Sequence, residues 1–348
     1  MVVRTSVSRA RGRHSVPRRP RAPIRAVLAV LGACAVVAAG TVAALAAGGS
    51  GSPPPARSAA ISTRSDPSAG RPNATATAPL ASPRSSPAPR AASAGSATAH
   101  AHRDPLGTAA ASYLSSRAGT VLAAVYDIGT GRTWHIGEGQ PQAEASVVKL
   151  DVLETLLSER GQGDGTGLSA SEQTQAEQMI EDSDNAAATS LWYEVGGPAR
   201  ISSFNTQAGL TDTVPSSCVV CPGFSWPGWG LTTTTPDDQI ALLRQLVMPS
   251  SLLTNAARDY ALSLMQGVTP SQRWGVSGGV PPQVTVALKN GWLPLRGTDS
   301  DWQINSVGWV SGAGRNYLMA VLTTGNPSEQ YGIDTIDRLA AMVWQQMS

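Results

Sequence analysis

The sequence predicts an α+β fold, in which an antiparallel sheet is flanked by helices and a helical lobe is inserted in the sheet. Strand-like segments stand at both ends of the region 103–348, and helix-like segments fill the interval between them. Strands that return to one sheet after a set of helices pair mainly as antiparallel neighbours. Regular alternation of strands and helices would instead predict a parallel sheet.

The first strands are expected in residues 120–139, TVLAAVYDIGTGRTWHIGEG. Apolar and polar residues alternate here on both sides of the turn sequence Gly129-Thr130-Gly131. This pattern predicts two antiparallel strands joined by a tight turn.

Helical periodicity follows from Ser146 onward. The recurring apolar residues are Val147, Leu150, Leu153, Leu156 and Leu157. The glycine-rich segment 161–167 ends this helix, and Ser169 with Glu172 three residues later predicts a capping box for the next. Helical character continues over 186–195, stops at Gly196-Gly197 and resumes near Pro198.

The second half begins with an irregular segment and ends with strands. Residues 210–235 are rich in Pro, Gly, Cys, Trp and Thr, which predicts a long loop of the sort that often carries function. TPDDQIALLRQL (235–246) opens another helix. Strand patterns return over 283–293, 301–310 and 315–325. Residues 331–347 predict a closing amphipathic helix with Ile333, Ile336, Ala340, Val343 and Met347 on one face.

The chain ahead of residue 103 has a different composition. Residues 1–25 hold eight arginines and no acid, and residues 26–47 carry no charge. An apolar run of this length spans a bilayer as a helix, and the arginines ahead of it follow the positive-inside rule. We expect a cytoplasmic basic tail, a transmembrane anchor or signal segment, and an exported remainder.

Two variants of this export signal are considered. Ala44-Leu45-Ala46 is a candidate signal-peptidase site, whose cleavage would release the protein. Leu31-Gly32-Ala33-Cys34 resembles a lipoprotein box, but apolar sequence continues well past Cys34. An uncleaved anchor or a long signal peptide is therefore favoured over lipidation.

Residues 48–102 are expected to form a disordered linker. They contain nine prolines and no aromatic residue, so they cannot bury enough apolar surface to fold. All nine tryptophans lie beyond them, which places the folded domain at about 103–348. That domain has a net charge of −10, which argues against nucleic-acid binding, whereas residues 1–102 carry +12.

The cysteines favour a disulfide over a metal site. Cys218 and Cys221 stand three residues apart in a segment expected outside the cytoplasm, where thiols oxidise. No second pair is present to complete a zinc site. A local disulfide is the first interpretation and a redox motif the second.

The two lysines are the chemically informative residues. Of 26 basic residues 24 are arginine, and only Lys149 and Lys289 are lysine. A desolvated lysine can lose its proton and act as a base, which arginine cannot do. Lys149 follows Ser146 by three residues, on the same face of a helix. His135 is the one histidine in the domain and lies on an expected strand, so a Ser–Lys pair is favoured over a Ser-His-Asp triad.

Three motifs occur in a recognisable order: Ser146-Val147-Val148-Lys149, Ser183-Asp184-Asn185 and Lys289-Asn290-Gly291. In this order they resemble the motifs of the penicillin-recognising serine enzymes, class A β-lactamases in particular. The resemblance extends over most of residues 120–345. It implies an antiparallel sheet flanked by helices, with the serine at the boundary with a helical lobe.

The resemblance also implies roles. Ser146 would be the nucleophile and Lys149 its base or proton shuttle. Ser183 would pass a proton to the leaving nitrogen, and Asn185 would hold the substrate amide. Lys289 would hold the Ser183 hydroxyl and offer positive charge to a substrate carboxylate.

Three further residues complete the expected substrate site. Asn290, Gly291 and Trp292 would contact the substrate, and the backbone N–H groups of Ser146 and Trp292 would form the oxyanion hole. Asp184 is expected to fix its loop and not to react.

The sequence also departs from the class A pattern. The glutamate motif that activates the deacylating water should lie within 209–235, where the one acid is Asp212. The interval between the first two motifs is also shorter. Asn290 replaces the usual threonine or serine, whose hydroxyl meets the substrate carboxylate, and Arg296 and Thr298 are the candidates to compensate for it. Acylation should be intact and deacylation slow.

The leading interpretation is an exported serine hydrolase that is acylated at Ser146 and opens β-lactam amide bonds. One alternative is a D,D-peptidase-like or esterase-like enzyme acting on peptidoglycan stem peptides. Another is a non-catalytic module that binds cell-wall fragments or antibiotic, with Phe224, Trp226 and Trp229 as the candidate binding residues. The two lysines argue against that module, because it would tolerate arginine. We expect a monomer with no metal or organic cofactor, at the bacterial cell membrane through residues 26–47 or secreted.

Overall fold

The computed structural model describes residues 103–161, 165–222, 228–295 and 301–347. The predicted tail, apolar segment and linker, residues 1–102, lie outside the described residues. None of the described helices is both long and apolar enough to span a bilayer.

The centre of the domain is a five-stranded sheet in the order β2-β1-β7-β6-β5, with every neighbouring pair antiparallel. The strands are β1 (Thr120–Asp127), β2 (Thr133–Ile136), β5 (Thr285–Pro294), β6 (Trp302–Gly312) and β7 (Arg315–Asn326). Pairing of β1 with β7, for example Val125 with Met319, joins the two ends of the domain. The predicted α+β class is confirmed.

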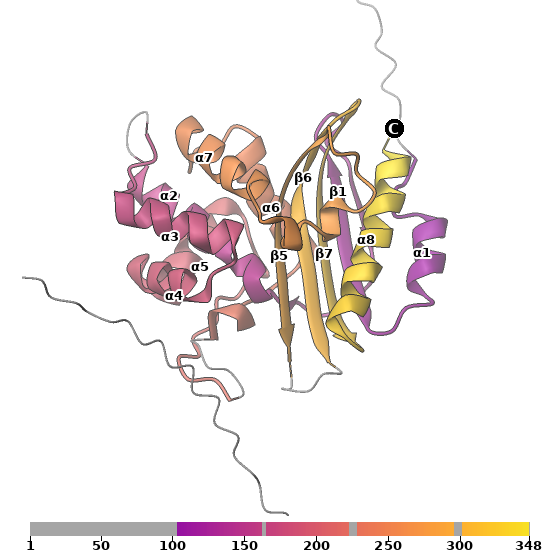
Figure 1. Ribbon diagram of the computed structural model, residues 1–348, viewed down its shortest axis with the longest axis horizontal. Coiled ribbons are helices and arrows are strands. Elements are labelled where there is room, and N and C mark those ends of the chain that lie inside the picture. The colour runs from indigo at the N-terminus through magenta and orange to yellow at the C-terminus, as the bar shows by residue number, and fades with distance from the viewer. Residues whose placement is uncertain (1–102, 162–164, 223–227, 296–300, 348) are drawn as a thin grey trace, which may run out of the picture. The chain divides into compact units, whose positions relative to one another are not determined.

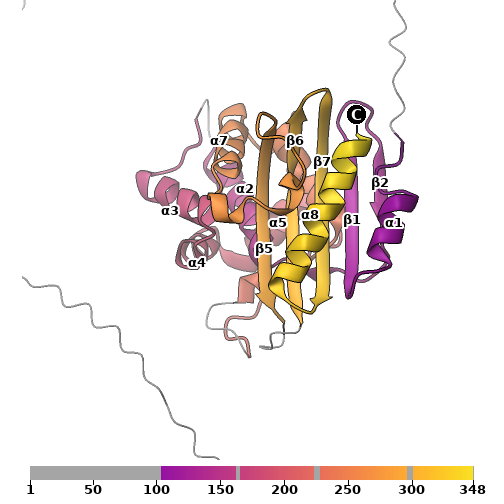
Figure 2. The ribbon, with the colours of Figure 1, turned by 45° about the vertical axis from the view of Figure 1, so that its right-hand side comes forward.

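Helices cover both faces of this sheet (Figures 1 and 2). One face carries α1 (Thr108–Leu114) and α8 (Glu329–Gln346). The other side carries α2 (Val148–Arg160), α3 (Ala170–Glu181), α4 (Asn185–Glu194), α5 (Gly197–Ala208), α6 (Pro236–Val247) and α7 (Asn255–Gln266). Two hydrophobic cores result, one on each face of the sheet.

Short elements connect these layers near the start of α2. Strands β3 (Gln142–Ala143) and β4 (Thr233–Thr234) pair as a small antiparallel sheet. The 3-10 helices are η1 (Ala145–Val147), η2 (Gly228–Leu231), η3 (Pro270–Gln272) and η4 (Gly275–Ser277). The small sheet therefore ties the segment before η1 to the end of the loop 209–235.

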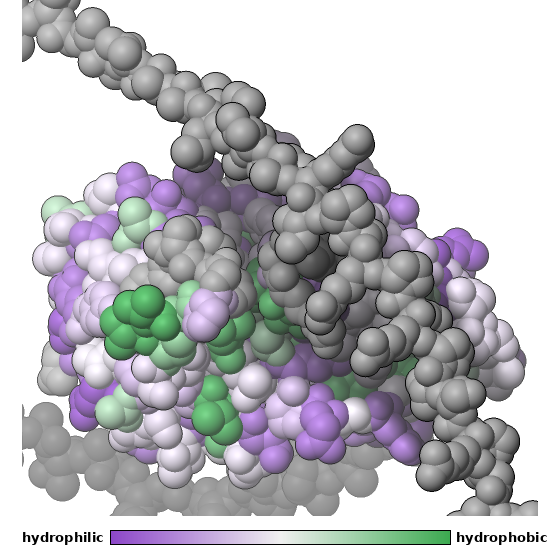
Figure 3. Space-filling view, turned by 90° about the horizontal axis from the view of Figure 1, so that it is seen from below, coloured by the Kyte–Doolittle hydropathy of each residue, from purple (hydrophilic) through white to green (hydrophobic). Residues whose placement is uncertain are grey.

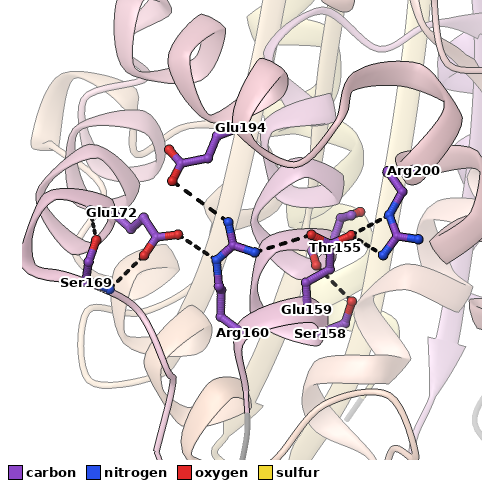
Figure 4. Close-up of polar contacts among 8 residues, drawn as sticks. All are labelled: Thr155, Ser158, Glu159, Arg160, Ser169, Glu172, Glu194 and Arg200. Atoms are coloured by element: carbon purple, nitrogen blue, oxygen red, sulfur yellow. Dashed lines mark hydrogen bonds and ion pairs between the residues drawn. The ribbon is translucent and has the colours of Figure 1, made fainter.

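An ion-pair network holds the helical lobe together (Figure 4). Arg160, at the end of α2, lies 2.8 Å from the Glu172 carboxylate and 3.9 Å from that of Glu194. Glu172 also closes the predicted capping box, because its side chain accepts from Ser169 N–H while Ser169 Oγ accepts from Glu172 N–H. The network therefore joins the ends of α2 and α4 to the start of α3.

Cys218 and Cys221 form a disulfide within the loop 209–235, as the sequence predicted. Three exposed valines lie in the same loop, Val214, Val219 and Val220.

Candidate active site

Ser146 lies in η1, directly ahead of α2, and follows a residue whose backbone has an unusual conformation. The preceding residue, Ala145, has φ +52°, in the left-handed region that costs a residue with a side chain about 1–3 kcal/mol. Strand β5 presses against this turn at Gly291, where an added Cβ would lie 2.7 Å from Glu144 O and 2.8 Å from Ser146 N. Only glycine allows β5 this close to the backbone of Ser146.

The two lysines converge on the hydroxyl of Ser183. Lys149 Nζ donates to Ser183 Oγ at 3.0 Å, to Ser183 O at 2.5 Å and to Asn185 Oδ1 at 2.8 Å. Lys289 Nζ donates to the same Oγ at 3.0 Å and to Asn290 O at 3.0 Å. The three motifs, which are far apart in the sequence, therefore meet at one point.

Burial lowers the pKa of both lysine side chains. Lys149 and Lys289 are fully buried. Burial, together with repulsion from Lys289 and against the attraction of Asp184, lowers the pKa of Lys149 to about 6. Burial lowers the pKa of Lys289 to about 7. Lys149 therefore releases its proton more readily than an ordinary lysine, and the neutral amine that results can accept a proton, as arginine cannot.

Ser183 is presented to the lysines by a strained turn between α3 and α4. Its φ of +57° lies in the left-handed region. The next residue, Asp184, is the N-cap of α4, and its carboxylate accepts from Ala187 N–H at 2.7 Å. Asp184 therefore fixes the turn, as expected, and leaves the Ser183 hydroxyl free to face the lysines.

The loop 209–235 brings an aromatic ring to Lys149. The Trp229 ring centroid lies 5.0 Å from Lys149 Nζ, and Trp229 Nε1 donates to Thr189 Oγ1 at 3.1 Å. Trp229 is 3% exposed, so it packs within the domain and is not an exposed ring. Phe224 and Trp226 lie outside the described residues.

A cavity of about 230 Å³ opens above these groups. It is lined by Ala145, Ser146, Asp182, Ser183, Asn185, Trp229, Gly230, Trp292, Leu293, Pro294 and Trp302. Of the predicted site residues, Ser146, Ser183, Asn185 and Trp292 thus line the cavity, and the two lysines lie beneath it. Four further lining residues were not predicted, namely Asp182, Leu293, Pro294 and Trp302. Their only signal in the sequence is closeness to a motif or to an expected strand end.

Comparison with known proteins identifies the family. A family model described as the beta-lactamase enzyme family matches residues 160–347, more than half of the chain. The chain belongs to the β-lactamase enzyme family. The matched range begins after Ser146 and Lys149, so the roles of these two residues rest on the site itself.

A curated relative in Mycobacterium tuberculosis, "Putative lipoprotein LppW", is 31% identical over 211 residues. The match covers 58% of this chain and 62% of the relative, so the chain spans less than two thirds of that protein's length.

Solved structures of related enzymes share the fold. The TLA-1 extended-spectrum β-lactamase superposes with a TM-score of 0.61 at 18% identity, covering 70% of this chain and 98% of that one. PBP-A gives 0.56 at 21% identity, covering 67% and 92%. A class A β-lactamase from Mycobacterium abscessus gives 0.53 at 23% identity, covering 68% and 96%. At these identities the likeness establishes the fold, which is that of class A β-lactamases.

Within this β-lactamase family fold, Asn290 does not occupy the position that the sequence suggested. Its side chain is fully buried, and Nδ2 donates to Gln272 O at 2.7 Å and to Trp274 O at 3.0 Å. Asn290 does not line the cavity among the described residues. In this structure the amide of Asn290 holds the segment before β5, and the substrate contact expected of this side chain stays a prediction. Arg296 and Thr298, the suggested substitutes, lie outside the described residues.

The family's deacylating glutamate has no counterpart beside the lysine. Asp212 is exposed, and its carboxylate accepts from the Thr211 hydroxyl at 2.9 Å. In the described part of the chain, no carboxylate is hydrogen-bonded to Ser146 or Lys149. The same ranges hold no group of three acidic, histidine or cysteine side chains suited to a metal ion.

Proposed function

We propose that the protein is an exported serine hydrolase of the β-lactamase family that is acylated at Ser146, opens β-lactam amide bonds and deacylates slowly. The observation that carries this proposal is the meeting of two desolvated lysines on the Ser183 hydroxyl, beneath a cavity that Ser146 lines. A buried pair of lysines serves no structural purpose that arginine or an apolar residue would not serve better.

The acylation step follows from these contacts. Neutral Lys149 takes the proton of Ser146, whose Oγ attacks the carbonyl carbon. The backbone N–H groups of Ser146 and Trp292 stabilise the oxyanion, a contribution worth about 100- to 1000-fold per donor. As the carbon–nitrogen bond breaks, Ser183 gives its proton to the nitrogen and regains one from the Lys149 ammonium, 3.0 Å away. Lys289 keeps the Ser183 hydroxyl in place.

We propose slow deacylation because the water molecule that hydrolyses the Ser146 acyl ester needs a general base beside it. Trp229 contacts Lys149 from the loop that carries this base in class A enzymes. An indole ring cannot accept a proton, so hydrolysis of the acyl-enzyme would lack the usual general-base contribution of about 100- to 10,000-fold.

The deciding experiment follows the intact mass of the protein over time after addition of benzylpenicillin, with Ser146→Ala as control. We expect an adduct of one penicillin on the wild type that persists for many minutes, and none on Ser146→Ala. Rapid turnover without accumulated adduct would contradict slow deacylation. An adduct on Ser146→Ala would contradict the assignment of the nucleophile.

A second candidate function is a D,D-peptidase-like enzyme acting on peptidoglycan stem peptides. It uses the same serine and lysines, and the absent deacylating acid favours it. Release of D-alanine from a D-Ala-D-Ala peptide by the wild type, and not by Ser146→Ala, would establish this activity.

We also propose that residues 1–25 are cytoplasmic, 26–47 an anchor or signal, 48–102 a linker and 103–348 the monomeric hydrolase domain. The name of the LppW relative calls it a lipoprotein, which supports export and membrane association. Retention of the full-length protein in the membrane fraction after alkaline washing would support an anchor.

A further inference from the structure

The turn that carries Ser183 depends on Lys149 for part of its support. Lys149 Nζ donates to two atoms of Ser183, the hydroxyl and the carbonyl oxygen, and to Asn185 Oδ1. These three bonds use all the hydrogens of an ammonium group. A neutral amine has one hydrogen fewer, and its lone pair must face Ser146 to take the proton. When Lys149 acts as the base, the turn therefore loses at least one of these bonds.

A second support for the turn comes from the segment after α7. Thr269 N–H donates to Glu181 O at 3.0 Å, and Gln272 Nε2 donates to Asp182 O at 3.0 Å. The two carbonyl groups belong to the residues directly ahead of Ser183. Neither bond involves the lysine, so both persist whether the lysine is charged or neutral.

The same segment is also bound to β5, the strand of the sheet nearest to the helical lobe (Figure 1). Asn290 Nδ2 donates to Gln272 O at 2.7 Å and to Trp274 O at 3.0 Å. Gln272 thus uses its side chain to hold the Ser183 turn and its backbone carbonyl to hold β5. It joins the turn to the strand that carries Lys289, whose Nζ donates to the Ser183 hydroxyl at 3.0 Å.

Gln272 lies outside the described lining of the cavity. The cavity lies at the end of β5, because Leu293 and Pro294 line it. On this side of the molecule hydrophobic areas lie among polar ones (Figure 3). An acyl donor bound there would meet Ser183, whereas the Gln272 amide acts through the turn that it holds.

We propose that Gln272 is a positioning residue, which keeps the Ser183 hydroxyl in place as Lys149 takes up and releases its proton. The inference rests on the proposed acyl-serine function. It concerns the step in which the carbon–nitrogen bond breaks: the nitrogen takes the Ser183 proton, and Ser183 regains one from the Lys149 ammonium. A leaving nitrogen needs this proton because its anion is strongly basic. A leaving p-nitrophenolate does not need it, because that anion is stable in water.

The test compares two acyl donors that differ in this need for a proton, benzylpenicillin and p-nitrophenyl phenylacetate. Acylation of Ser146 in the full-length protein is followed at neutral pH, by intact mass for both and by p-nitrophenol release for the ester. Gln272→Met keeps the size of the side chain but cannot donate to Asp182 O. We expect this variant to slow acylation by benzylpenicillin about tenfold and acylation by the ester by less than about twofold.

Two further variants sharpen the test. Ser271→Ala is the matched control, because Ser271 is exposed and lies in the same 3-10 helix, and it should leave both rates within about twofold of the wild type. Gln272→Asn keeps the amide but shortens the side chain by one carbon, so it should lose the bond to the turn and behave like Gln272→Met. Equal loss of both rates in the Gln272 variants would overturn the proposal, since it would assign Gln272 to the fold as a whole.

The outcomes separate this inference from the function on which it rests. If both reagents acylate the wild type but not Ser146→Ala, and the Gln272 variants keep the wild-type ratio of the two rates, only the inference fails. If neither reagent acylates Ser146 in the wild type, the proposed function fails and the inference fails with it.

Discussion

The role proposed for Lys149 requires a side chain that can hold a proton and also release it near neutral pH. Lysine meets this need only because the site removes it from water. We predict that Lys149→Arg slows acylation by p-nitrophenyl phenylacetate at least 100-fold, because the general base is lost. Burst kinetics of p-nitrophenol release measure this, with thermal unfolding as a check on folding. Retention of acylation to within tenfold would mean that Lys149 is not the base.

The lowered pKa of Lys149 predicts a pH profile. Below a pKa of about 6 the ammonium is charged and cannot accept the proton of Ser146, so acylation should rise from pH 5 to a plateau above pH 7. An uncharged ester is the suitable substrate, because it does not titrate in this range. Lys289→Met removes a neighbouring charge that lowers the pKa of Lys149, so the midpoint should move upward. A midpoint above pH 9 in the wild type would contradict the neutral-amine mechanism.

Single residues of the site differed in how far the sequence could predict them. Ser146, Lys149, Ser183 and Lys289 were predicted from motif order and lysine scarcity, and the structure brings the two lysines to Ser183. The burial and partners of Asn290 and Trp229 could not be predicted, because their surroundings come from segments distant in the sequence. The carbonyl oxygens that Asn290 binds belong to a segment 16 and 18 residues earlier.

Among the elements, α3 depends on one side chain, Glu172, which caps its own helix and also binds Arg160 at the end of α2. Burial of Glu172 would raise its pKa, but hydrogen bonds from Ser169 and the contact with Arg160 outweigh this and lower it. Glu172→Gln should lower the free energy of unfolding by about 1–2 kcal/mol at pH 7, since it weakens both the cap and the ion pair. A carboxyl group with a lowered pKa stabilises the fold at pH values above its pKa in the unfolded state. The stability that Glu172→Gln loses should therefore shrink as the pH falls below about 4.

Chemical denaturation of Glu172→Gln and Glu177→Gln tests this prediction. Glu177 is exposed on the same helix, so its substitution should change stability by less than about 0.5 kcal/mol. Equal effects of the two substitutions at pH 7 would contradict a special role for Glu172.

Elements with strong apolar periodicity were predicted and weakly patterned ones were not. The terminal strands and the closing helix α8 follow their predicted segments closely. Helix α7 was missed because two of its four buried positions, Ala257 and Ala261, are alanines, which give a faint apolar stripe. Its N-cap Thr254, which accepts from Ala257 N–H at 3.1 Å, was the available signal. Helix α1 was missed for a similar reason, since Ala110 is its one buried residue.

For the whole molecule, the strands and the fold class could be predicted, but the pairing of each strand with its neighbours could not. Alternation indicates a strand without saying which strand lies beside it. That β5 is the edge strand, and so lies free to press on η1 at Gly291, depends on the order β2-β1-β7-β6-β5. The position of Ser146, the proposed nucleophile, is thus a property of the assembled sheet.

Buried carboxyl groups in and just before helix α2 are a second property of the whole molecule that the sequence did not reveal. Glu144, Asp151 and Glu154 are fully buried. Burial, opposed by a hydrogen bond from Asn205 and aided by repulsion from Asp238, raises the pKa of Asp151 to about 7. Burial and repulsion from Asp151 raise the pKa of Glu154 well above its usual range. Among the described residues, neither Glu154 carboxylate oxygen has a hydrogen-bond partner, so the fold offers little to stabilise the charged form of this group.

Glu154→Gln should therefore make the protein more stable at pH 8 but not at pH 5. A carboxyl whose pKa is raised in the folded state favours folding fully below its unfolded pKa of about 4.3, and this benefit is lost as the pH rises toward the folded value. Glutamine keeps the shape of the protonated acid without this dependence. Thermal unfolding of both proteins at pH 5 and pH 8 measures the difference, and Glu177→Gln serves as the exposed control. A Glu154→Gln protein that is less stable than the wild type by the same amount at both pH values would show that Glu154 is ionised in the fold, with a partner to stabilise its charge.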